Sequence, residues 1–373
     1  MSNITTSILT TAKEQLDQSI NQANQVYTQL DNKSKDINDK VFGRKFKPKF
    51  TQTIYCMNYL DDNNQYRTVS YNTNTLDSTL IAYKNAGIEG ISIPIHIGYR
   101  SDTNTLYYQT NLTTIDYVIS KCNQLGIPVF FMKFHEGYTI DNVFAMGIDA
   151  FKTKFKAMVQ EVCDRYKNNG IQYLGLFNEW QNFYKVNGVT YNSVVYDFVP
   201  FVLECFNIAK NDGFKVSVSC AGVSADGWSS WIIVDDTVKN ACDIFMVNGY
   251  PPIGNKGQYT TMQDCLDGWN NYGLHNVIRQ IRQQYGGKPV IMSETGIMDY
   301  WYNFFVPGDS SLRYGILSNG ETGYRYLYGL FESLKQYDTD TLLAVNWWYD
   351  STFTTYTDKM KPLISSYLKG GIN

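Results

Sequence analysis

The feature that most constrains the fold is a cadence that begins near residue 51 and repeats to the end of the chain. In each repeat an apolar, β-rich run is followed by a loop and then by an amphipathic helical pattern. Several helical patterns end in Gly, which favours a helix C-terminus. The eight apolar runs predict strands at 53–59, 90–97, 127–134, 171–177, 214–220, 243–250, 288–294 and 342–348.

Continuous apolar strands separated by helices are typical of a parallel sheet that is buried on both faces. Eight such units within residues 51–373 match a closed (β/α)8 TIM barrel, a fold of the α/β class. A doubly wound open sheet is the alternative. Its nucleotide-binding forms lose support, because no GxGxxG follows the first predicted strand and no GxxxxGK[ST] occurs.

Residues 4–41 differ from the rest of the chain, being polar and free of Gly and Pro. Apolar or small side chains recur there at a three-four spacing, interrupted by Lys33, as in a heptad seam: Leu9, Ala12, Leu16, Ser19, Ala23, Val26, Leu30 and Ile37. The pattern predicts either a coiled-coil-like helix that joins a homo-oligomer or larger assembly, or a helix packed on its own barrel. GRKFKPKF (43–50) reads as a basic linker. The predicted domains are therefore a helical stalk, 1–45, and a barrel, 46–373.

The composition of the chain limits the classes of partner that we expect it to bind. A formal net charge of -3 and a pI near 5.7 give no basic excess, so we expect no nucleic-acid partner. The first residues lack a basic start, an apolar core and a cleavage site, which predicts no signal peptide and synthesis in the cytoplasm. No apolar run approaches the roughly 18 residues of a membrane span, so no membrane partner is expected. Seven scattered cysteines without a CxxC pair predict buried free thiols.

Polar and aromatic residues gather where the predicted strands end, which in a TIM barrel is where the reacting groups lie. They are His96, Tyr99, His135, Glu136, Asn178, Glu179, Trp180, Asn248, Tyr250, Glu294, Trp347 and Trp348. Glu179 and Glu294 are 115 residues apart (294 minus 179), yet their strands can both project side chains over one barrel mouth. Cleavage of a glycosidic bond needs such a pair of carboxyl groups, and the environment of each decides which one holds the proton.

Two sequence motifs contain Glu179 and Glu294. FNEW (177–180) and MSETG (292–296) resemble the two signatures of the clan A retaining glycoside hydrolases. The resemblance implies that Glu179 is the general acid/base and Glu294 the nucleophile. It also implies that Asn178 forms a hydrogen bond with the sugar 2-hydroxyl and that Tyr250 contacts the nucleophile. Trp347 or Trp348 would form the floor of the subsite that binds the cleaved sugar.

Within the clan, Lys133-Phe134-His135 is similar to the Lys-x-His sequence that ends the third strand in the β-mannanase-like branch. The arginine that many clan members place near the end of strand two has no clear counterpart, since Arg100 lies several residues beyond the predicted strand. Glycosidase-like barrels of this clan also occur in bacteriophage tail proteins, and a barrel behind a helical stalk is similar to that arrangement. This likeness implies that the protein is a virion component.

Other strand-end residues have two interpretations. Glu136 reads as a loop acid rather than a third catalyst. His135 and His96 are either core histidines or ligands of sugar hydroxyls. No metal site is predicted, because no HExxH-like spacing occurs and carboxylate glycosidase chemistry needs neither metal nor cofactor. Aromatic rings stack well on sugar faces, and the candidates for such stacking are Trp180, Trp301, Tyr302, Trp347 and Trp348.

The sequence thus predicts a retaining β-glycoside hydrolase that acts on a polysaccharide by double displacement. The alternative is a weakly active or inactive barrel that serves as a carbohydrate-binding or structural subunit of a larger assembly. A barrel aldolase or isomerase would want a strand-end lysine, for which Lys133 is the one candidate, or phosphate-binding glycine loops.

Overall fold

The computed structural model describes residues 45–56, 73–179, 189–191, 194–221, 234–251, 261–271, 274–296, 321–348 and 360–368, together with seven single positions between Lys13 and Val26. The chain divides into two compact units. One comprises Met1–Lys45 with Ser365–Asn373, and the other is Phe46–Ile364.

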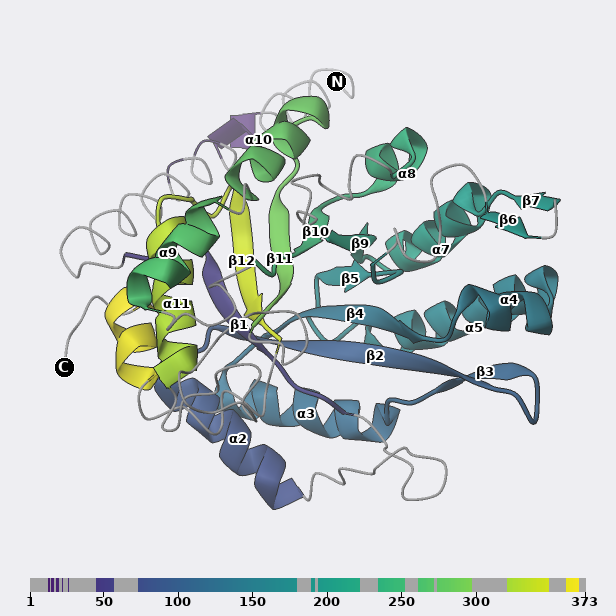
Figure 1. Cartoon of the computed structure of the whole chain (residues 1–373), viewed down its shortest axis with the longest axis horizontal. Helices are drawn as coiled ribbons and strands as arrows, with labels where there is room; N and C mark the ends of the chain where they lie inside the picture. Colours follow the sequence, from purple (N-terminus) through teal and green to yellow (C-terminus); the bar gives the residue numbers. More distant parts are fainter. Residues whose placement is uncertain are drawn as a thin grey trace, which may run out of the picture. The chain divides into compact units, whose positions relative to one another are not determined.

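The larger unit is built on a ring of parallel strands (Figure 1). The strands are β1 (Lys49–Thr53), β2 (Gly90–Arg100), β4 (Val129–Gly137), β5 (Tyr173–Gly175), β8 (Lys215–Ser217), β9 (Ser219–Ala221), β10 (Phe245–Asn248), β11 (Val290–Thr295) and β12 (Leu342–Trp347). Their order is β8-β5-β4-β2-β1-β12-β11-β10-β9. Because β8 and β9 are two halves of one extended stretch divided at Val218, the two ends of the sheet meet in the same stretch of chain. The predicted (β/α)8 barrel is confirmed.

Helices connect the strands in the order that the sequence predicts. They are α2 (Thr73–Ala86), α3 (Leu112–Leu125), α4 (Ile140–Met146), α5 (Ile148–Tyr166), α7 (Val199–Asn211), α8 (Asp236–Ala241), α9 (Met262–Asn271), α10 (Leu274–Gln284) and α11 (Glu321–Leu334). Shorter strands extend the loops: β3 (Thr105–Tyr108) is antiparallel to β2, and β6 (Val189–Tyr191) forms a hairpin with β7 (Val194–Tyr196). No helix in the described part of the chain combines the length and apolar composition needed to cross a bilayer.

The local sequence explains where these helices begin and end, as α3 illustrates. The Asn111 side chain accepts hydrogen bonds from the backbone N–H groups of Thr113 and Thr114, which fixes the first turn. Gly126 ends the helix with φ 69°, a left-handed conformation that glycine adopts without steric cost. Between the caps, a buried stripe at helical spacing faces the sheet: Ile115, Val118, Ile119 and Cys122.

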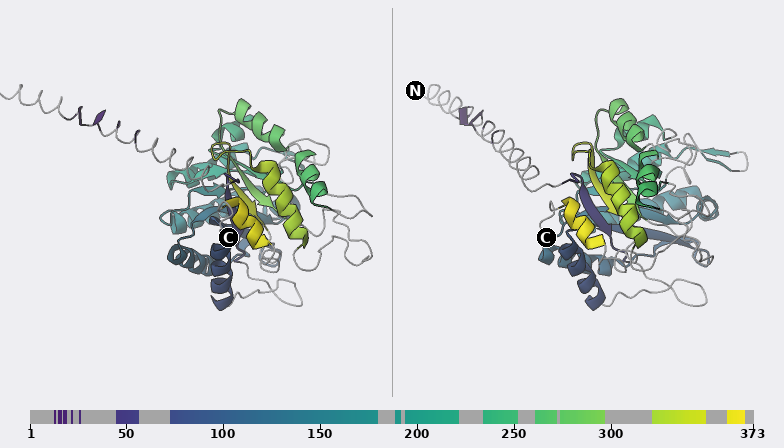
Figure 2. Two further views of the ribbon diagram at one scale, coloured as in Figure 1. Left: turned by 90° about the vertical axis from the view of Figure 1, so that its left-hand side faces the viewer. Right: turned by 60° about the vertical axis from the view of Figure 1, so that its left-hand side comes forward.

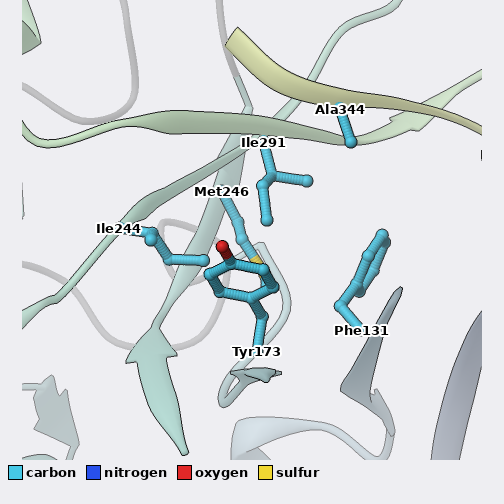
Figure 3. Packing of buried hydrophobic residues seen from close by; sticks show 6 residues of the cluster. All are labelled: Phe131, Tyr173, Ile244, Met246, Ile291 and Ala344. Atoms are coloured by element: carbon cyan, nitrogen blue, oxygen red, sulfur yellow. The ribbon is translucent and has the colours of Figure 1, made fainter. Parts of the chain in front are cut away.

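The barrel interior is apolar towards the N-terminal ends of the strands. Figure 3 shows Tyr173, Ile244 and Met246 in contact there, with Phe131 and Ile291 beside them. This layer closes the ring from below, so it is a packed core and not a channel.

Nearer the C-terminal ends the interior becomes polar, and Asn346 of β12 is its centre. Its Oδ1 accepts hydrogen bonds from Thr51 Oγ1 at 3.0 Å and Ser92 Oγ at 2.8 Å. Its Nδ2 donates to Thr53 Oγ1 at 2.8 Å and to the Ser293 carbonyl at 2.9 Å. One fully bonded amide therefore ties four adjacent strands, β1, β2, β11 and β12, together.

The prediction for the first strand and the segment before it was wrong. The strand is β1, Lys49–Thr53, not 53–59, and residues 45–50 are not a linker, because Phe46 and Phe50 are completely buried. Both rings pack on Phe331 of α11, which lies over β1 and β12 in Figure 2. The alternation of lysines with Phe46, Pro48 and Phe50 is the period-two pattern of a strand, which the many charges obscured.

Two further boundaries differ from prediction. Residues 193–213 follow the fourth predicted strand with a helical pattern, but Val194–Tyr196 form β7 and α7 begins only at Val199, with Pro200 in its first turn. Strand β4 runs to Gly137, three residues past its predicted end. All seven cysteines are free and buried, as predicted.

Candidate active site

The centre of the barrel mouth is a buried ion pair. Lys133, on β4, donates from Nζ to Glu294 Oε1, on β11, and the two side chains are 1% and 5% exposed. Tyr250, just after β10, donates its hydroxyl to the other carboxylate oxygen, Oε2, at 3.0 Å. Both oxygens of Glu294 thus accept from a positive or polar donor, and the two bonds fix the orientation of the carboxylate.

Hydrogen bonds lead from this ion pair to the second glutamate. Lys133 Nζ also donates to Asn178 Oδ1 at 2.8 Å. Asn248 Nδ2 reaches the same oxygen at 3.3 Å and Glu179 Oε1 at 3.5 Å. The five residues come from β4, β10, β11 and the turn after β5, and the ring of strands brings them together at one end of the barrel.

Glu179 is carried by a turn of unusual backbone geometry. Phe177 and Glu179 have φ values of 63° and 46°, in the left-handed region that non-glycine residues seldom occupy. Phe177 is completely buried and stacks on Phe155 of α5, with ring centroids 4.8 Å apart. The backbone therefore turns sharply at the end of β5, and such strain is common where a side chain must be aimed at a functional site.

Aromatic rings form one wall of the site. The Trp348 ring stacks on His135 at 5.5 Å between centroids, and Lys133 Nζ lies 4.7 Å from its centroid. His135 in turn lies 4.5 Å from His96, and Tyr55 packs edge-on against Trp348 at 5.5 Å. Tyr55 was not among the predicted site residues, because the first strand was predicted at 53–59 and Tyr55 fell inside it, whereas β1 ends at Thr53.

The two histidines are neutral. Burial and then the charge of Lys133 lower the pKa of His135 to about 3. Burial, with a smaller contribution from the neighbouring His135, also holds the pKa of His96 well below its usual range. His96 Nε2 and His135 Nδ1 have no hydrogen-bond partner within the described ranges. A neutral imidazole with an unbonded nitrogen can donate a hydrogen bond to a hydroxyl group or accept one from it. Such a group suits an uncharged hydroxyl ligand better than a charged ligand.

The structure separates the two tryptophans that the resemblance left open. Trp348 is in the aromatic wall, whereas Trp347 is completely buried and packs edge-on against Tyr326 of α11, with centroids 5.7 Å apart. Adjacent residues of a strand point to opposite faces, so Trp347 faces the helix layer. Its prediction as a substrate-binding residue was therefore wrong. Trp180, Trp301 and Tyr302 lie outside the described residues.

The interpretation of Glu136 as a loop acid was wrong. It lies within β4 and is 8% exposed. Arg100 is the last residue of β2, not several residues beyond it, but its exposed guanidinium lies over the Tyr107 ring, 5.0 Å from the centroid. The cation at Glu294 is therefore Lys133.

The sequence marked Lys133 as part of the Lys-x-His motif and as a strand-end lysine, but it did not predict the pairing of Lys133 with Glu294. A signal was present: Lys133 and His135 share one face of a buried strand, so both point into the barrel. Gly175 leaves room for the lysine, since a Cβ there would lie 2.8 Å from Lys133 Cγ. No group of three or more His, Cys, Asp or Glu in the described part of the chain is placed to hold a metal ion.

We expect Lys133→Met to lower kcat/KM about 100-fold, the usual effect of removing one buried stabilising donor. Leaving the Glu294 charge buried without its cation should also lower the free energy of unfolding by about 3–5 kcal/mol. Initial rates and urea denaturation measure the two effects.

Lys121→Met is the matched control, because Lys121 pairs with Asp77 at 2.7 Å near the surface. It should change the free energy of unfolding by less than about 1 kcal/mol and leave activity unchanged. Activity of Lys133→Met within twofold of the native protein would contradict a role for the ion pair.

Comparison with known proteins agrees with this geometry. The model of the cellulase family, glycosyl hydrolase family 5, matches residues 55–303, a range that contains both glutamates. No curated protein matches the chain.

Among solved structures, a GH113 β-1,4-mannanase in a complex superposes with a TM-score of 0.54 at 13% identity, over 87% of this chain and 98% of that one. The GH113 β-mannanase of Alicyclobacillus acidocaldarius, in complex with ManMIm, gives 0.53 at 10% identity, over 87% and 99%. A GH5_18 protein of Bifidobacterium longum, in complex with Manb1-4GlcNAc, gives 0.50 at 11% identity, over 80% and 68%. At these identities the likeness concerns the fold alone. The match of the family model over residues 55–303, on a parallel barrel whose mouth joins two strand-end glutamates, shows that the chain belongs to glycosyl hydrolase family 5.

Proposed function

We propose that this glycoside hydrolase cleaves a β-linked polysaccharide with retention of configuration, with Glu294 as the nucleophile and Glu179 as the acid/base. The observation that carries the proposal is the fixed carboxylate of Glu294, whose two oxygens accept hydrogen bonds from Lys133 and Tyr250. Glu179 joins the same network through Asn248 Nδ2, which lies 3.5 Å from its Oε1. A fixed carboxylate suits nucleophilic attack, and a second carboxyl group at the same barrel mouth suits proton transfer.

The mechanism follows from these positions. Glu294 attacks the anomeric carbon while Glu179 protonates the departing oxygen, which gives a glycosyl-enzyme. Glu179 then takes a proton from the water that releases the sugar. Asn178, which shares Lys133 with the nucleophile, bonds the sugar 2-hydroxyl, and Trp348 stacks on the ring in the subsite of the cleaved sugar.

We propose β-1,4-mannan as the first substrate to test. The Lys133-Phe134-His135 sequence and the fold shared with the β-mannanases support it. The unbonded nitrogens of His96 and His135 give the site two groups for sugar hydroxyls.

The experiment measures release of reducing ends from β-mannan, β-glucan, β-galactan and bacterial surface polysaccharides. NMR of the first product then reports its anomeric configuration. We expect hydrolysis of at least one β-glycan with initial release of the β-anomer. Failure to cleave any of them would overturn the proposal, and initial release of the α-anomer would overturn the retaining mechanism.

A second proposal concerns residues 1–45, which we take to attach the barrel to copies of itself or to a larger assembly, such as a virion tail. Leu16 and Val26 are 60% and 53% exposed, and the sequence pattern puts them on one heptad seam. We expect deletion of residues 1–45 to lower the number of subunits per particle, obtained from light scattering as the particle mass divided by the mass of one chain. An unchanged number of subunits would remove the argument for an attachment helix, whether or not the barrel is active.

A further inference from the structure

Glu136 lies behind the site, on the side of β4 opposite to Lys133 and His135. Phe134 shares its face and packs against Phe155 of α5, with centroids 5.7 Å apart. Glu136 therefore points towards the helix layer, in an apolar setting, and not into the barrel mouth. A carboxyl group that is 92% buried without lying in the pocket needs a reason to be there.

Its one hydrogen bond to the site reaches the backbone. Glu136 Oε2 accepts from the Asn178 N–H at 2.8 Å, while Oε1 has no partner among the described residues. Asn178 is the middle residue of the turn between the two left-handed residues, Phe177 and Glu179.

Each of the three turn residues has a separate restraint. The Phe177 carbonyl accepts from the Ser219 N–H at 3.0 Å, and the Phe177 ring stacks on Phe155. Glu179 has the Asn248 amide. Glu136 supplies the acceptor for the residue between them, and without it a buried N–H would be left unbonded.

We propose that Glu136 is a positioning residue, which holds the left-handed turn at residues 177–179 and so aims Glu179 at the leaving-group oxygen. The inference rests on the proposed function, because it assigns the acid/base role to Glu179.

The protonation state of Glu136 fits this role. Burial raises the pKa of Glu136 to about 8, against the opposing effects of the Asn178 N–H and the Lys133 charge, and with a smaller contribution from Glu179. Near neutral pH the group is therefore a neutral acid whose carbonyl oxygen accepts the N–H. Its ionisation at higher pH would place a negative charge near Glu179.

Two variants separate the hydrogen bond from the charge. Glu136→Gln keeps a neutral acceptor and cannot ionise, so kcat on polysaccharide should stay within about threefold of native. Glu136→Leu removes the acceptor, and we expect kcat to fall about 30-fold with little change in KM, a part of the roughly 100- to 10,000-fold effect of general acid catalysis. On aryl glycosides with a strongly activated leaving group, which need little protonation, the loss in Glu136→Leu should be under about threefold.

Glu89→Leu is the matched control. Glu89 Oε2 accepts the Phe50 N–H at 3.0 Å, the same kind of bond at the opposite end of the barrel. Loss of this bond should lower the free energy of unfolding. Any change in kcat should be the same on polysaccharide and on aryl glycosides. Equal losses on both substrate classes in Glu136→Leu, or no loss, would overturn the proposal.

A crystal structure of Glu136→Leu tests the same point without activity. We expect Phe177 and Glu179 to leave their left-handed conformations. An unchanged turn would overturn the positioning role, whether or not the native protein cleaves a glycan. Absence of glycan cleavage by the native protein would overturn only the proposed function.

Discussion

Glu294→Gln is expected to abolish turnover, with kcat on any substrate reduced by about 10⁴-fold or more, because an amide cannot form the glycosyl-enzyme. Activated aryl glycosides should be affected as strongly as polysaccharides, since nucleophilic attack is needed for both. Stopped-flow release of the aryl group measures the loss. Retention of more than about 1% of native activity would refute the assignment of the nucleophile.

The same change should destabilise the protein, and a double variant distinguishes the two effects. Glu294→Gln leaves the Lys133 ammonium buried without its counter-charge, which should lower the free energy of unfolding by about 3–5 kcal/mol. Adding Lys133→Met removes the orphaned charge, so stability should recover while activity stays absent. Recovery of both would mean that the single variant was inactive only because it was poorly folded.

Glu179→Ala is expected to lower kcat on polysaccharide by about 10²- to 10⁴-fold, the usual contribution of a general acid. On an aryl glycoside with an activated leaving group the first step should survive, because that group departs without a proton. The glycosyl-enzyme should then accumulate, since no base activates water, and a burst of aryl release should precede a slow phase.

Azide should accelerate the slow phase, because it attacks the glycosyl-enzyme without losing a proton, and should yield the β-glycosyl azide. Glu204→Ala is the control, since Glu204 is half exposed and pairs only with Lys156 on the surface among the described contacts. It should leave every rate unchanged. Equal loss on both substrates, with no response to azide, would contradict the acid/base role.

The fold could be predicted because eight apolar runs separated by helices match a closed barrel, and the glycine motifs of the nucleotide-binding open sheets do not occur. The errors occurred where composition and packing disagree. Phe46 and Phe50 alternate with lysines that lie on the opposite side of the chain, and their charge made a buried segment look like a linker. The end of β4 was missed because His135, Glu136 and Gly137 look like loop residues until both sides of the strand are seen to be covered.

The site could be predicted in its motifs but not in its supporting contacts. FNEW and MSETG identified Glu179 and Glu294, and strand alternation was enough to distinguish Trp348 from Trp347 had it been applied. The pairing of Lys133 with Glu294 and the bond from Glu136 to Asn178 join residues 161 and 42 positions apart. Those contacts depend on strand neighbours and register, which a single sequence does not encode in any local pattern.

Closure of the ring also has a consequence for synthesis. β1 pairs with β12, Lys49 opposite Ala344, so one of the first strands translated waits for one of the last. Asn346, which ties four strands together, and Trp348, which completes the aromatic wall, belong to that late segment. A nascent chain that ends before β12 would present unpaired edges on β1 and β11, and one that ends before Trp348 would lack part of the aromatic wall. The complete barrel mouth should therefore form only once the chain has emerged from the ribosome through Trp348.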